Sequence, residues 1–358
     1  MTPAENRHRK PPRSAVEALR SRAETVLPGP VSEFFGQGAG AGVSAAEATQ
    51  RWDRLRLRPR VLTNVSTVST AARVLGHDLP SPILVAPTTL QRMAHPDGEV
   101  ATARAVAAQG SLMCVSSNAG STFEDIAATG VRWWLQVYVL RDRGLTTAIL
   151  QRGREAGASA VVLTADTPVV GRKAEAGESV WSIVPDEFVL ANADWRDLPE
   201  NALDKADDLS PDTIGWLHEV TGLPVVLKGV LRGDDARTVA QAGAAAVYVS
   251  NHGGRQLDLA VATADVLPEV ADAVAGTVEV YADGGIRRAE HVLAALALGA
   301  DAVFVGRPVL WALAAGGSDA VARLLAGLTD DLDHALRLAG ARNLGEVTAD
   351  LVRPYLPG

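Results

Sequence analysis

A short apolar run followed by a helical stretch repeats along most of the chain. The apolar runs span residues 82–87, 112–117, 134–139, 160–167, 224–230, 246–251, 278–285 and 302–308. They are rich in β-branched residues without strict alternation, as expected of parallel strands covered on both faces. Three intervening helical stretches end in a glycine suited to a left-handed C-cap, in AGAS, AGAA and LGAD. Eight strands alternating with helices predict an α/β fold, a closed (β/α)8 TIM barrel.

A doubly wound open sheet is the alternative architecture. Such a sheet normally carries fewer strands and an early GxGxxG phosphate loop, which this chain lacks. The glycine-rich stretch at 36–42 follows no predicted strand, so we interpret it as a flexible turn.

Two segments fall outside the repeat. The region before the first strand has helical character near 14–27 and 44–55 and is expected to cap one end of the barrel. The stretch after the fourth strand lacks clear periodicity and mixes apolar residues with acids, which is typical of a functional lid. The predicted units are an N-terminal tail and helical cap (1–80), the barrel (81–340), its lid (168–210) and a C-terminal tail (341–358).

Charge and cysteine content narrow the classes of protein. The 358 residues carry a formal net charge of −8, which repels nucleic acid and anionic membrane surfaces. Cys114 is the only cysteine, so no disulfide and no cysteine-based metal site is expected. No apolar run reaches the roughly 18–20 residues that span a bilayer, and no signal peptide opens the chain. We expect a cytoplasmic protein without a structural metal.

Polar residues gather where the predicted strands end, which is the end that carries the active site in such barrels. All eight runs have such residues at or just after their C-terminal ends. They include Thr88, Thr89, Ser116, Asn118, Gln136, Tyr138, Thr164, Asp166, Lys228, Ser250, His252, Arg255, Asp283, Arg287 and Arg307.

The last two strands indicate a phosphate site. In DGGIRR (283–288) and GRP (306–308), glycines allow close backbone approach and arginines can grip oxygens bidentately. Barrels often bind phosphate after these strands. The pattern suits a phosphorylated substrate or a phosphorylated cofactor.

A histidine base stands beside a fixed positive charge in the motif SNHGGR (250–255). A carboxylate bound to Arg255 could present its α-carbon to His252. Asp166 could hold the imidazole and stabilise its protonated form, and Lys228 offers positive charge to a group that becomes anionic.

These motifs resemble those of the FMN-dependent 2-hydroxy acid oxidases and dehydrogenases, which include glycolate, lactate and mandelate enzymes. The resemblance is carried by ILVAPTTLQRMAHPDGE, LQVYV, LTADTP, LPVVLKGV, SNHGGRQLD, ADGGIRR and ALALGADAVFVGRP. It runs from about Phe34 to Arg337.

The resemblance implies FMN as cofactor and a role for each matching position. His252 would take the substrate proton, oriented by Asp166, and Tyr138 would contact the substrate's hydroxyl or carboxylate. Arg255 would hold the carboxylate, and Lys228 would stabilise the anionic reduced flavin. The implied FMN-binding residues are Pro87, Thr88, Thr89, Ser116, Gln136, Thr164, Lys228, Ser250, Asp283, Gly285, Arg287, Gly306 and Arg307.

Several substrate-binding positions depart from the family pattern. Phe34 stands where the family usually has a tyrosine, and Lys173 replaces a second carboxylate-binding arginine. Asn118 replaces the tryptophan that narrows the pocket of glycolate-type members, and the lid is shorter. Together these changes predict a roomier, more apolar pocket for a bulky, aromatic (S)-2-hydroxy acid of the mandelate type.

The electron acceptor expected from the resemblance is dioxygen, with a quinone or a carrier protein as alternatives. A homo-oligomer, specifically a tetramer, is implied by the resemblance alone. The competing functions are oxidation of an amine or a natural-product intermediate on the same barrel, an FMN-using isomerase, and a flavin-binding protein that has lost catalysis.

Overall fold

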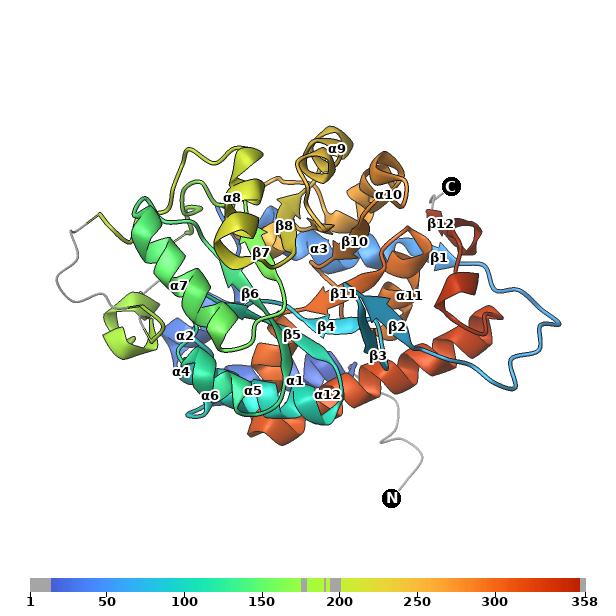
Figure 1. Ribbon diagram of the computed structural model, residues 1–358. Helices are drawn as coiled ribbons and strands as arrows, with labels where there is room; N and C mark the ends of the chain where they lie inside the picture. Colours follow the sequence, from blue (N-terminus) through green and yellow to red (C-terminus); the bar gives the residue numbers. More distant parts are fainter. Residues whose placement is uncertain (1–13, 175–178, 190, 194–200, 355–358) are drawn as a thin grey trace, which may run out of the picture.

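The predicted barrel is confirmed in a computed structural model that describes residues 14–174, 179–189, 191–193 and 201–354 (Figure 1). Eight parallel strands close on themselves, β11 pairing with β4. The barrel strands are β4 (Ile83–Val85), β5 (Leu112–Ser116), β6 (Arg132–Val137), β7 (Val161–Thr164), β8 (Val225–Val230), β9 (Ala246–Val249), β10 (Glu279–Ala282) and β11 (Ala302–Val305).

Alternate residues of these strands face two different cores. One set packs against the surrounding helices, and the other fills the barrel interior. Large aromatic rings dominate the interior, where Trp134, Tyr248, Tyr281 and Phe304 contact one another. The rings of Tyr248 and Phe304 are stacked with centroids 4.6 Å apart. This packing fills the barrel with side chains.

Helices surround the barrel as the periodicity predicted. The helices that follow the barrel strands are α5 (Gly98–Ala108), α6 (Phe123–Ala127), α7 (Arg143–Glu155), α8 (Asp212–Thr221), α9 (Gly233–Gln241), α10 (Thr263–Val274), α11 (Ala289–Ala297) and α12 (Arg307–Ala339). Short helical turns are α4 (Gln91–Ala94), η1 (Val180–Ser182), η2 (Asp186–Phe188), η3 (His252–Gly254), η4 (Leu344–Glu346) and η5 (Ala349–Leu351). The glycines after α7, α9 and α11 have φ of 99°, 93° and 101°, so each takes the left-handed conformation expected before the next strand.

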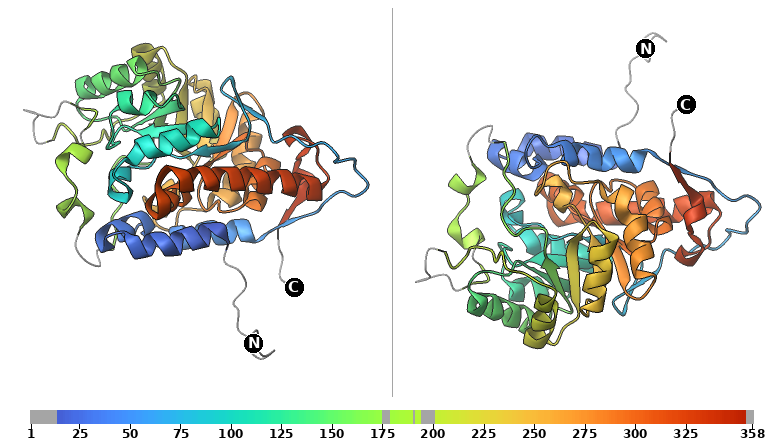
Figure 2. Two further views of the ribbon diagram at one scale, coloured as in Figure 1. Left: turned by 90° about the horizontal axis from the view of Figure 1, so that it is seen from below. Right: turned by 90° about the horizontal axis from the view of Figure 1, so that it is seen from above.

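Helix α12 is long and apolar enough, by length and composition alone, to cross a membrane. It is bent at Gly316 and Gly317, whose backbone angles are not helical. Its buried face packs against α5, α11 and the N-terminal helix α1 (Ala15–Val26) (Figure 2). In this fold α12 therefore serves as the last helix around the barrel.

The N-terminal region covers the barrel through α1, α2 (Gly29–Gly36) and α3 (Val43–Asp53). Helix α3 is fixed to the strand ends, because Trp52 Nε1 donates to Gly284 O at 2.7 Å and Ser44 N donates to Asp258 Oδ1 at 3.0 Å. The carboxylate of Asp258 also satisfies a free N–H group at the start of α3.

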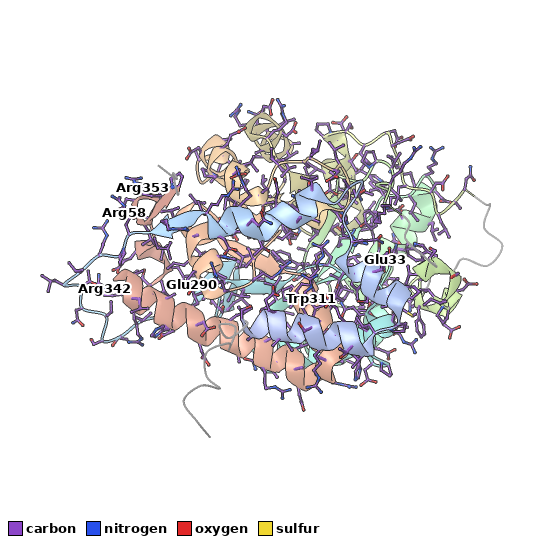
Figure 3. The ribbon with its side chains drawn as sticks, turned by 180° about the vertical axis from the view of Figure 1, so that it is seen from behind. Glu33, Arg58, Glu290, Trp311, Arg342 and Arg353 are labelled. Carbon is purple, nitrogen blue, oxygen red and sulfur yellow. The ribbon has the colours of Figure 1, made fainter. Side chains whose placement is uncertain are left out.

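Two small antiparallel sheets complete the fold. Strand β1 (Leu55–Leu57) pairs with β12 (Val352–Pro354), so the cap is tied to the C-terminal region. Arg58 and Arg353 mark this pairing in Figure 3. The hairpin β2 (Ala72–Val74) and β3 (His77–Leu79) contributes Val74 and Leu79 to the barrel-interior core.

The glycine-rich stretch at 36–42 differs from its interpretation as a flexible turn. Ala39 N donates to Gly254 O at 2.8 Å, and Gly40 N donates to Arg172 O at 2.9 Å. A Cβ on Gly38 would lie 3.2 Å from Gly254 O, and one on Gly40 would lie 3.0 Å from the Cβ of Asp258. The glycines here permit close packing between the cap and two active-site loops.

Candidate active site

A cavity of 610 Å³ opens at the C-terminal ends of the barrel strands. Every barrel strand, or the loop that follows it, contributes to its wall. The remaining wall comes from α2 and from the lid after β7. Most of the polar residues predicted at the strand ends therefore do converge on one space. Asp166 and Ser250 lie behind its wall and are bonded to the wall residues His252 and Lys228.

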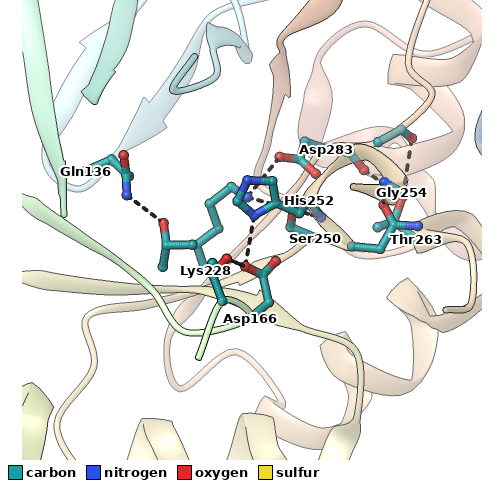
Figure 4. A network of polar contacts seen from close by, with 12 residues as sticks. Gln136, Asp166, Lys228, Ser250, His252, Gly254, Thr263 and Asp283 are labelled. Atoms are coloured by element: carbon teal, nitrogen blue, oxygen red, sulfur yellow. Dashed lines mark hydrogen bonds and ion pairs between the residues drawn. The ribbon is translucent and has the colours of Figure 1, made fainter. Parts of the chain in front are cut away.

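His252 and Asp166 form a close pair (Figure 4). His252 Nδ1 lies 2.9 Å from Asp166 Oδ1, which leaves Nε2 as the other ring nitrogen. Burial and the positive charge of Lys228 lower the pKa of His252, whereas the hydrogen bond to Asp166 opposes this shift. Although burial opposes ionisation of Asp166, Lys228 and the hydrogen bond from His252 hold the pKa of Asp166 below its ordinary value. The pair is arranged as a neutral imidazole beside a carboxylate.

The backbone of His252 is strained. Its φ of 56° lies in the left-handed region, and a side chain such as histidine occupies that region uncommonly. His252 N donates to Ser250 Oγ at 3.0 Å, and the next residue, Gly253, also has a positive φ. The two glycines of SNHGGR thus allow the turn that directs this imidazole.

Tyr138 faces His252 from the end of β6. Its hydroxyl oxygen lies 3.4 Å from His252 Nε2, and the two rings are stacked at 20°. Burial raises the pKa of Tyr138, and the negative charge of Asp166 adds to the effect. The phenol therefore stays protonated and can donate a hydrogen bond.

Lys228 lies deep in the cavity wall with only 5% of its side chain exposed. Its ammonium donates to Ser250 Oγ at 2.9 Å and lies 3.7 Å from Asp283 Oδ2. The second oxygen of Asp283 has no partner among the described residues. This fixed cation can stabilise negative charge that develops on a bound group.

Arg255 is held by the cap. Its Nη1 donates to Phe34 O at 2.6 Å and to Gln37 O at 3.1 Å. The guanidinium lies 4.7 Å from the centroid of the Phe34 ring. Burial and the charge of Arg307 lower the pKa of Arg255 to about 10. Arg255 stays charged at neutral pH, and neither acceptor is a carboxylate.

The other three predicted substrate-binding residues also line the cavity. Lys173 donates to Gly171 O at 3.1 Å, and burial together with Arg255 lowers its pKa. Asn118 is held through its backbone, since its N–H donates to Ser116 Oγ at 3.1 Å. Phe34 packs edge-on against Trp181 of the lid, with centroids 5.6 Å apart. These contacts build a wall in which the apolar rings of Phe34 and Trp181 adjoin the Arg255 guanidinium.

The predicted flavin-contacting residues lie along the rim. Gln136 Nε2 donates to Thr164 Oγ1 at 2.9 Å, and Gln91 Nε2 donates to Thr88 Oγ1 at 3.1 Å. Thr89 Oγ1 donates to Asn118 O at 2.8 Å. Pro87 and Ser116 complete the set on this part of the wall.

The predicted phosphate end contains two arginines without a carboxylate partner among the described residues. Arg307 donates to Phe35 O and Gln37 O at 3.0 and 3.1 Å, and Arg287 donates to Ile286 O at 2.8 Å. Burial and the charge of Arg307 lower the pKa of Arg287 to about 9. Gly306 precedes the N-terminus of α12, whose free N–H groups attract an anion. This donor set, with its uncompensated charge, fits the phosphate of FMN.

Lys205 is among the cavity residues that the sequence reasoning missed. Lys205 lines the cavity from the lid, although it stands alone in the acid-rich, non-periodic stretch ALDKADD. Neither spacing nor a motif connects it to the strand ends. Only the backbone path of the lid places it there.

The sequence matches the family described as FMN-dependent dehydrogenase over residues 23–354, and the chain belongs to this family. It is an oxidoreductase of the FMN-dependent 2-hydroxy acid oxidase class, with FMN as its cofactor. The chain is 40% identical to glycolate oxidase of Spinacia oleracea, with 93% of this chain and 94% of that protein covered. It is also 40% identical to L-lactate oxidase of Nostoc sp., with 91% and 94% covered.

Solved structures of mandelate oxidase are similar in fold. The structure with (S)-4-hydroxymandelic acid has a TM-score of 0.86 at 37% identity, covering 94% of this chain and 98% of that one. A mandelate oxidase variant solved with an FMN adduct has a TM-score of 0.84 at 38% identity, covering 92% and 97%. Both comparisons agree with the barrel predicted from the sequence.

Proposed function

We propose that this protein oxidises a bulky, aromatic (S)-2-hydroxy acid to the corresponding 2-oxo acid and passes the electrons to dioxygen. The observation that carries the proposal is the pairing of His252 with Asp166 on the same wall as Arg255 and Tyr138. This arrangement places a base, a hydrogen-bond donor and a carboxylate-binding cation around one small space.

Different residues would carry out substrate binding and proton transfer. Arg255 binds the α-carboxylate through nitrogens that are not directed at the cap carbonyls. Tyr138 donates to the substrate oxygen, and His252 Nε2 accepts the hydroxyl proton while Nδ1 donates to Asp166. Asp166 then stabilises the imidazolium by charge. FMN, when bound, would accept the α-hydrogen together with its two electrons, which leaves the 2-oxo acid and a protonated His252.

A bulky substrate is favoured by the apolar side of the cavity. Phe34 and Trp181 form an edge-to-face pair on this side. Because Phe34 has no hydroxyl group, it offers apolar contact where a tyrosine would offer a hydrogen bond. An aromatic side chain on the substrate would pack against this pair.

The test is anaerobic bleaching of the flavin spectrum by matched acids. Lactate, glycolate, mandelate and 4-hydroxymandelate are added in turn as single enantiomers, and air is then admitted. We expect fastest bleaching by an (S)-aromatic acid and rapid return of the colour in air. Equal rates with glycolate and mandelate would contradict the aromatic preference, and slow recovery in air would contradict dioxygen as acceptor. A flavin that no 2-hydroxy acid bleaches would overturn the proposal.

A further inference from the structure

Lys205 is held over the cavity by backbone pairing between the lid and the end of β6. Ala206 N donates to Val139 O and Arg141 N donates to Asp204 O, both at 2.8 Å. Leu140 and Lys205 form an antiparallel bridge between these segments. The segment that carries Tyr138 therefore also positions Lys205.

Lys205 is partly buried, and its ammonium has no hydrogen bond or ion pair within the described ranges. It lies 3.7 Å from the centroid of the Tyr138 ring, on the ring face. Burial lowers its pKa to about 8, Lys173 adds to this effect, and Asp166 opposes it. A desolvated cation without an anionic partner costs free energy, and a ring face returns only part of that cost.

Positive charge exceeds negative charge around the cavity. Among the described wall residues the cations are Arg172, Lys173, Lys205, Lys228, Arg255, Arg287 and Arg307. The wall carboxylates are Glu33 and Asp283, and Asp166 lies just behind, bound to His252. The phosphate of FMN and one substrate carboxylate would still leave positive charge in excess.

Lys205 is held by a different part of the structure from Arg255, the cation assigned to the α-carboxylate. Arg255 is anchored to the cap carbonyls of Phe34 and Gln37, whereas Lys205 is anchored to the strand end that carries Tyr138. The hydroxyl of Tyr138 is directed at His252, and Lys205 stands over the ring instead. An anion on Lys205 would therefore belong to a different part of the ligand.

We propose that Lys205 binds a second anionic group, carried on the side chain of the substrate. This inference rests on the proposed oxidation of a 2-hydroxy acid and narrows its substrate class to 2-hydroxy diacids with a bulky side chain. The side chain would pack on the apolar wall and extend its acid group to Lys205.

The experiment uses FMN-loaded enzyme and two matched pairs of (S)-acids. Mandelate is compared with 4-carboxymandelate, and 2-hydroxyhexanoate with 2-hydroxyadipate. In the wild type we expect each diacid to have the higher kcat/KM. In Lys205→Met, loss of a charge-assisted contact should reduce kcat/KM for the diacids by about 10- to 100-fold and for the monoacids by less than about threefold. Lys205→Arg should keep most of the preference.

A matched control removes a nearby charge that lies outside the cavity wall. Arg141 is in the segment paired with Lys205, but its side chain is about half exposed and pairs with Asp207 at 3.2 Å. Arg141→Met should leave the diacid preference unchanged. FMN content and the flavin spectrum verify that each variant is folded.

Ligand binding gives a second readout that does not depend on turnover. The dissociation constants of benzoate and terephthalate are measured from the flavin difference spectrum between about pH 7 and pH 10. Lys205 must be protonated to bind an anion, so wild-type affinity for terephthalate should fall as pH rises through about 8. The charged or titratable groups facing Lys205 are Asp166, Lys173 and Tyr138, which Lys205→Met retains. In Lys205→Met, the affinities for terephthalate and benzoate should depend on pH in the same way.

The outcomes separate this inference from the proposed function. One outcome is that monoacids bleach the flavin as fast as diacids do, with kcat/KM for both classes unchanged in Lys205→Met. In that case Lys205 binds no substrate anion, and the assignment as a 2-hydroxy acid oxidase still stands. If no 2-hydroxy acid bleaches the flavin, the proposed function itself is wrong. If Lys205→Met does not retain FMN, the wild-type matched pairs and the pH dependence of terephthalate binding decide the question.

Discussion

The imidazole of His252 has its geometry set by a strained backbone and one carboxylate. The left-handed φ directs the side chain into the cavity, and Asp166 engages Nδ1 at 2.9 Å. The other nitrogen, Nε2, is therefore the one that meets Tyr138 and the substrate. Strain at a functional position is kept only when surrounding contacts maintain it, and here Ser250 and the two following glycines do so.

Replacing His252 with asparagine should slow flavin reduction without loss of FMN. Asparagine tolerates the left-handed backbone, so the loop is expected to keep its shape. Loss of a general base typically costs about 10²- to 10⁴-fold in rate. Anaerobic stopped-flow reduction by the best substrate measures the effect, with the flavin spectrum as the folding control. A reduction rate within about threefold of wild type would exclude His252 as the base.

The pH dependence of kcat/KM should report the neutral form of His252. Burial and Lys228 lower its pKa, so the active neutral imidazole persists below the ordinary value of 6.5 and is lost as pH falls through the lowered pKa. In Asp166→Asn the contributions that raise this pKa are removed. The midpoint should then move to still lower pH, although the maximal rate falls because the imidazolium loses its stabilising charge. An upward shift of the midpoint would contradict this assignment.

Sequence reasoning identified the strand-end residues because their position follows directly from the barrel topology. His252, Asp166, Lys228 and Arg255 each lie at or just after a predicted strand, and the structure brings them together. Lys205 could not be found in this way, since a non-periodic lid gives no rule for where its side chains point. The binding of Arg255 to two cap carbonyls was equally hidden, because it joins residues more than two hundred positions apart.

At the scale of elements, the loop after β10 packs closely against helix α3. Gly285 has a φ of 81°, and a Cβ at this position would lie 2.2 Å from the carbonyl oxygen of Ala48. The glycines of DGGIRR were predicted from the sequence to let the backbone approach a phosphate closely. The structure adds that the same residue lets the cap pack on the phosphate loop.

Gly285→Ala should therefore weaken FMN retention and lower the melting temperature. Its matched control is Gly276→Ala, because Gly276 has a φ of 74° but open space around its Cβ position. Both variants incur left-handed strain of about 1–2 kcal/mol, and only Gly285→Ala adds a steric clash. Thermal unfolding and the FMN-to-protein ratio after desalting measure the difference. Equal behaviour of the two variants would show that the contact with Ala48 is unimportant.

The lid was predicted in part from the sequence. Its irregular character and its place on the cavity wall were anticipated from length and composition, and η1 brings Trp181 to Phe34. The predicted lid also includes residues 175–178, 190 and 194–200, which lie outside the described residues. What composition alone did not indicate is the backbone pairing of residues 204–206 with the end of β6.

For the whole molecule, the barrel could be predicted because its signal is local. Each strand and each following helix has its own periodicity, and their number determines closure. The covering of the barrel could not be predicted in the same way. Helix α1 packs on α12, α3 binds the loops after β9 and β10, and β1 pairs with β12. These contacts join the first and last parts of the chain, where no short sequence pattern specifies a partner.

Removing FMN should lower the stability of the entire protein. Arg287 and Arg307 carry charge into the cavity wall, and Arg307 is bound to the cap carbonyls of Phe35 and Gln37. Without a bound anion, the two positively charged side chains repel each other, and this repulsion weakens the contact between the cap and the barrel. Binding to the folded state alone adds about 2.7 kcal/mol when free FMN is at 100 times its dissociation constant. Thermal unfolding of apoprotein should show a melting temperature that rises with FMN.

Inorganic phosphate separates the contribution of these arginines from that of the flavin ring. It should raise the melting temperature of the apoprotein by a smaller amount than FMN does. Sodium chloride at the same ionic strength serves as the control for general screening. A melting temperature that phosphate and chloride change equally would place the flavin phosphate elsewhere.

The pairing of β1 with β12 has a consequence for the protein during its synthesis. Leu57 leaves the ribosome long before its partner Val352 has been translated. At about 5–20 residues per second the delay is on the order of 15–60 s. Helix α1, which carries the buried residue Val16, packs against α12, and Trp52 stacks on His291 of α11, so these apolar residues stay uncovered until α11 and α12 have been made. The N-terminal end of the nascent chain therefore lacks its packing partners for most of synthesis, and its pairing with the last strand forms at the end.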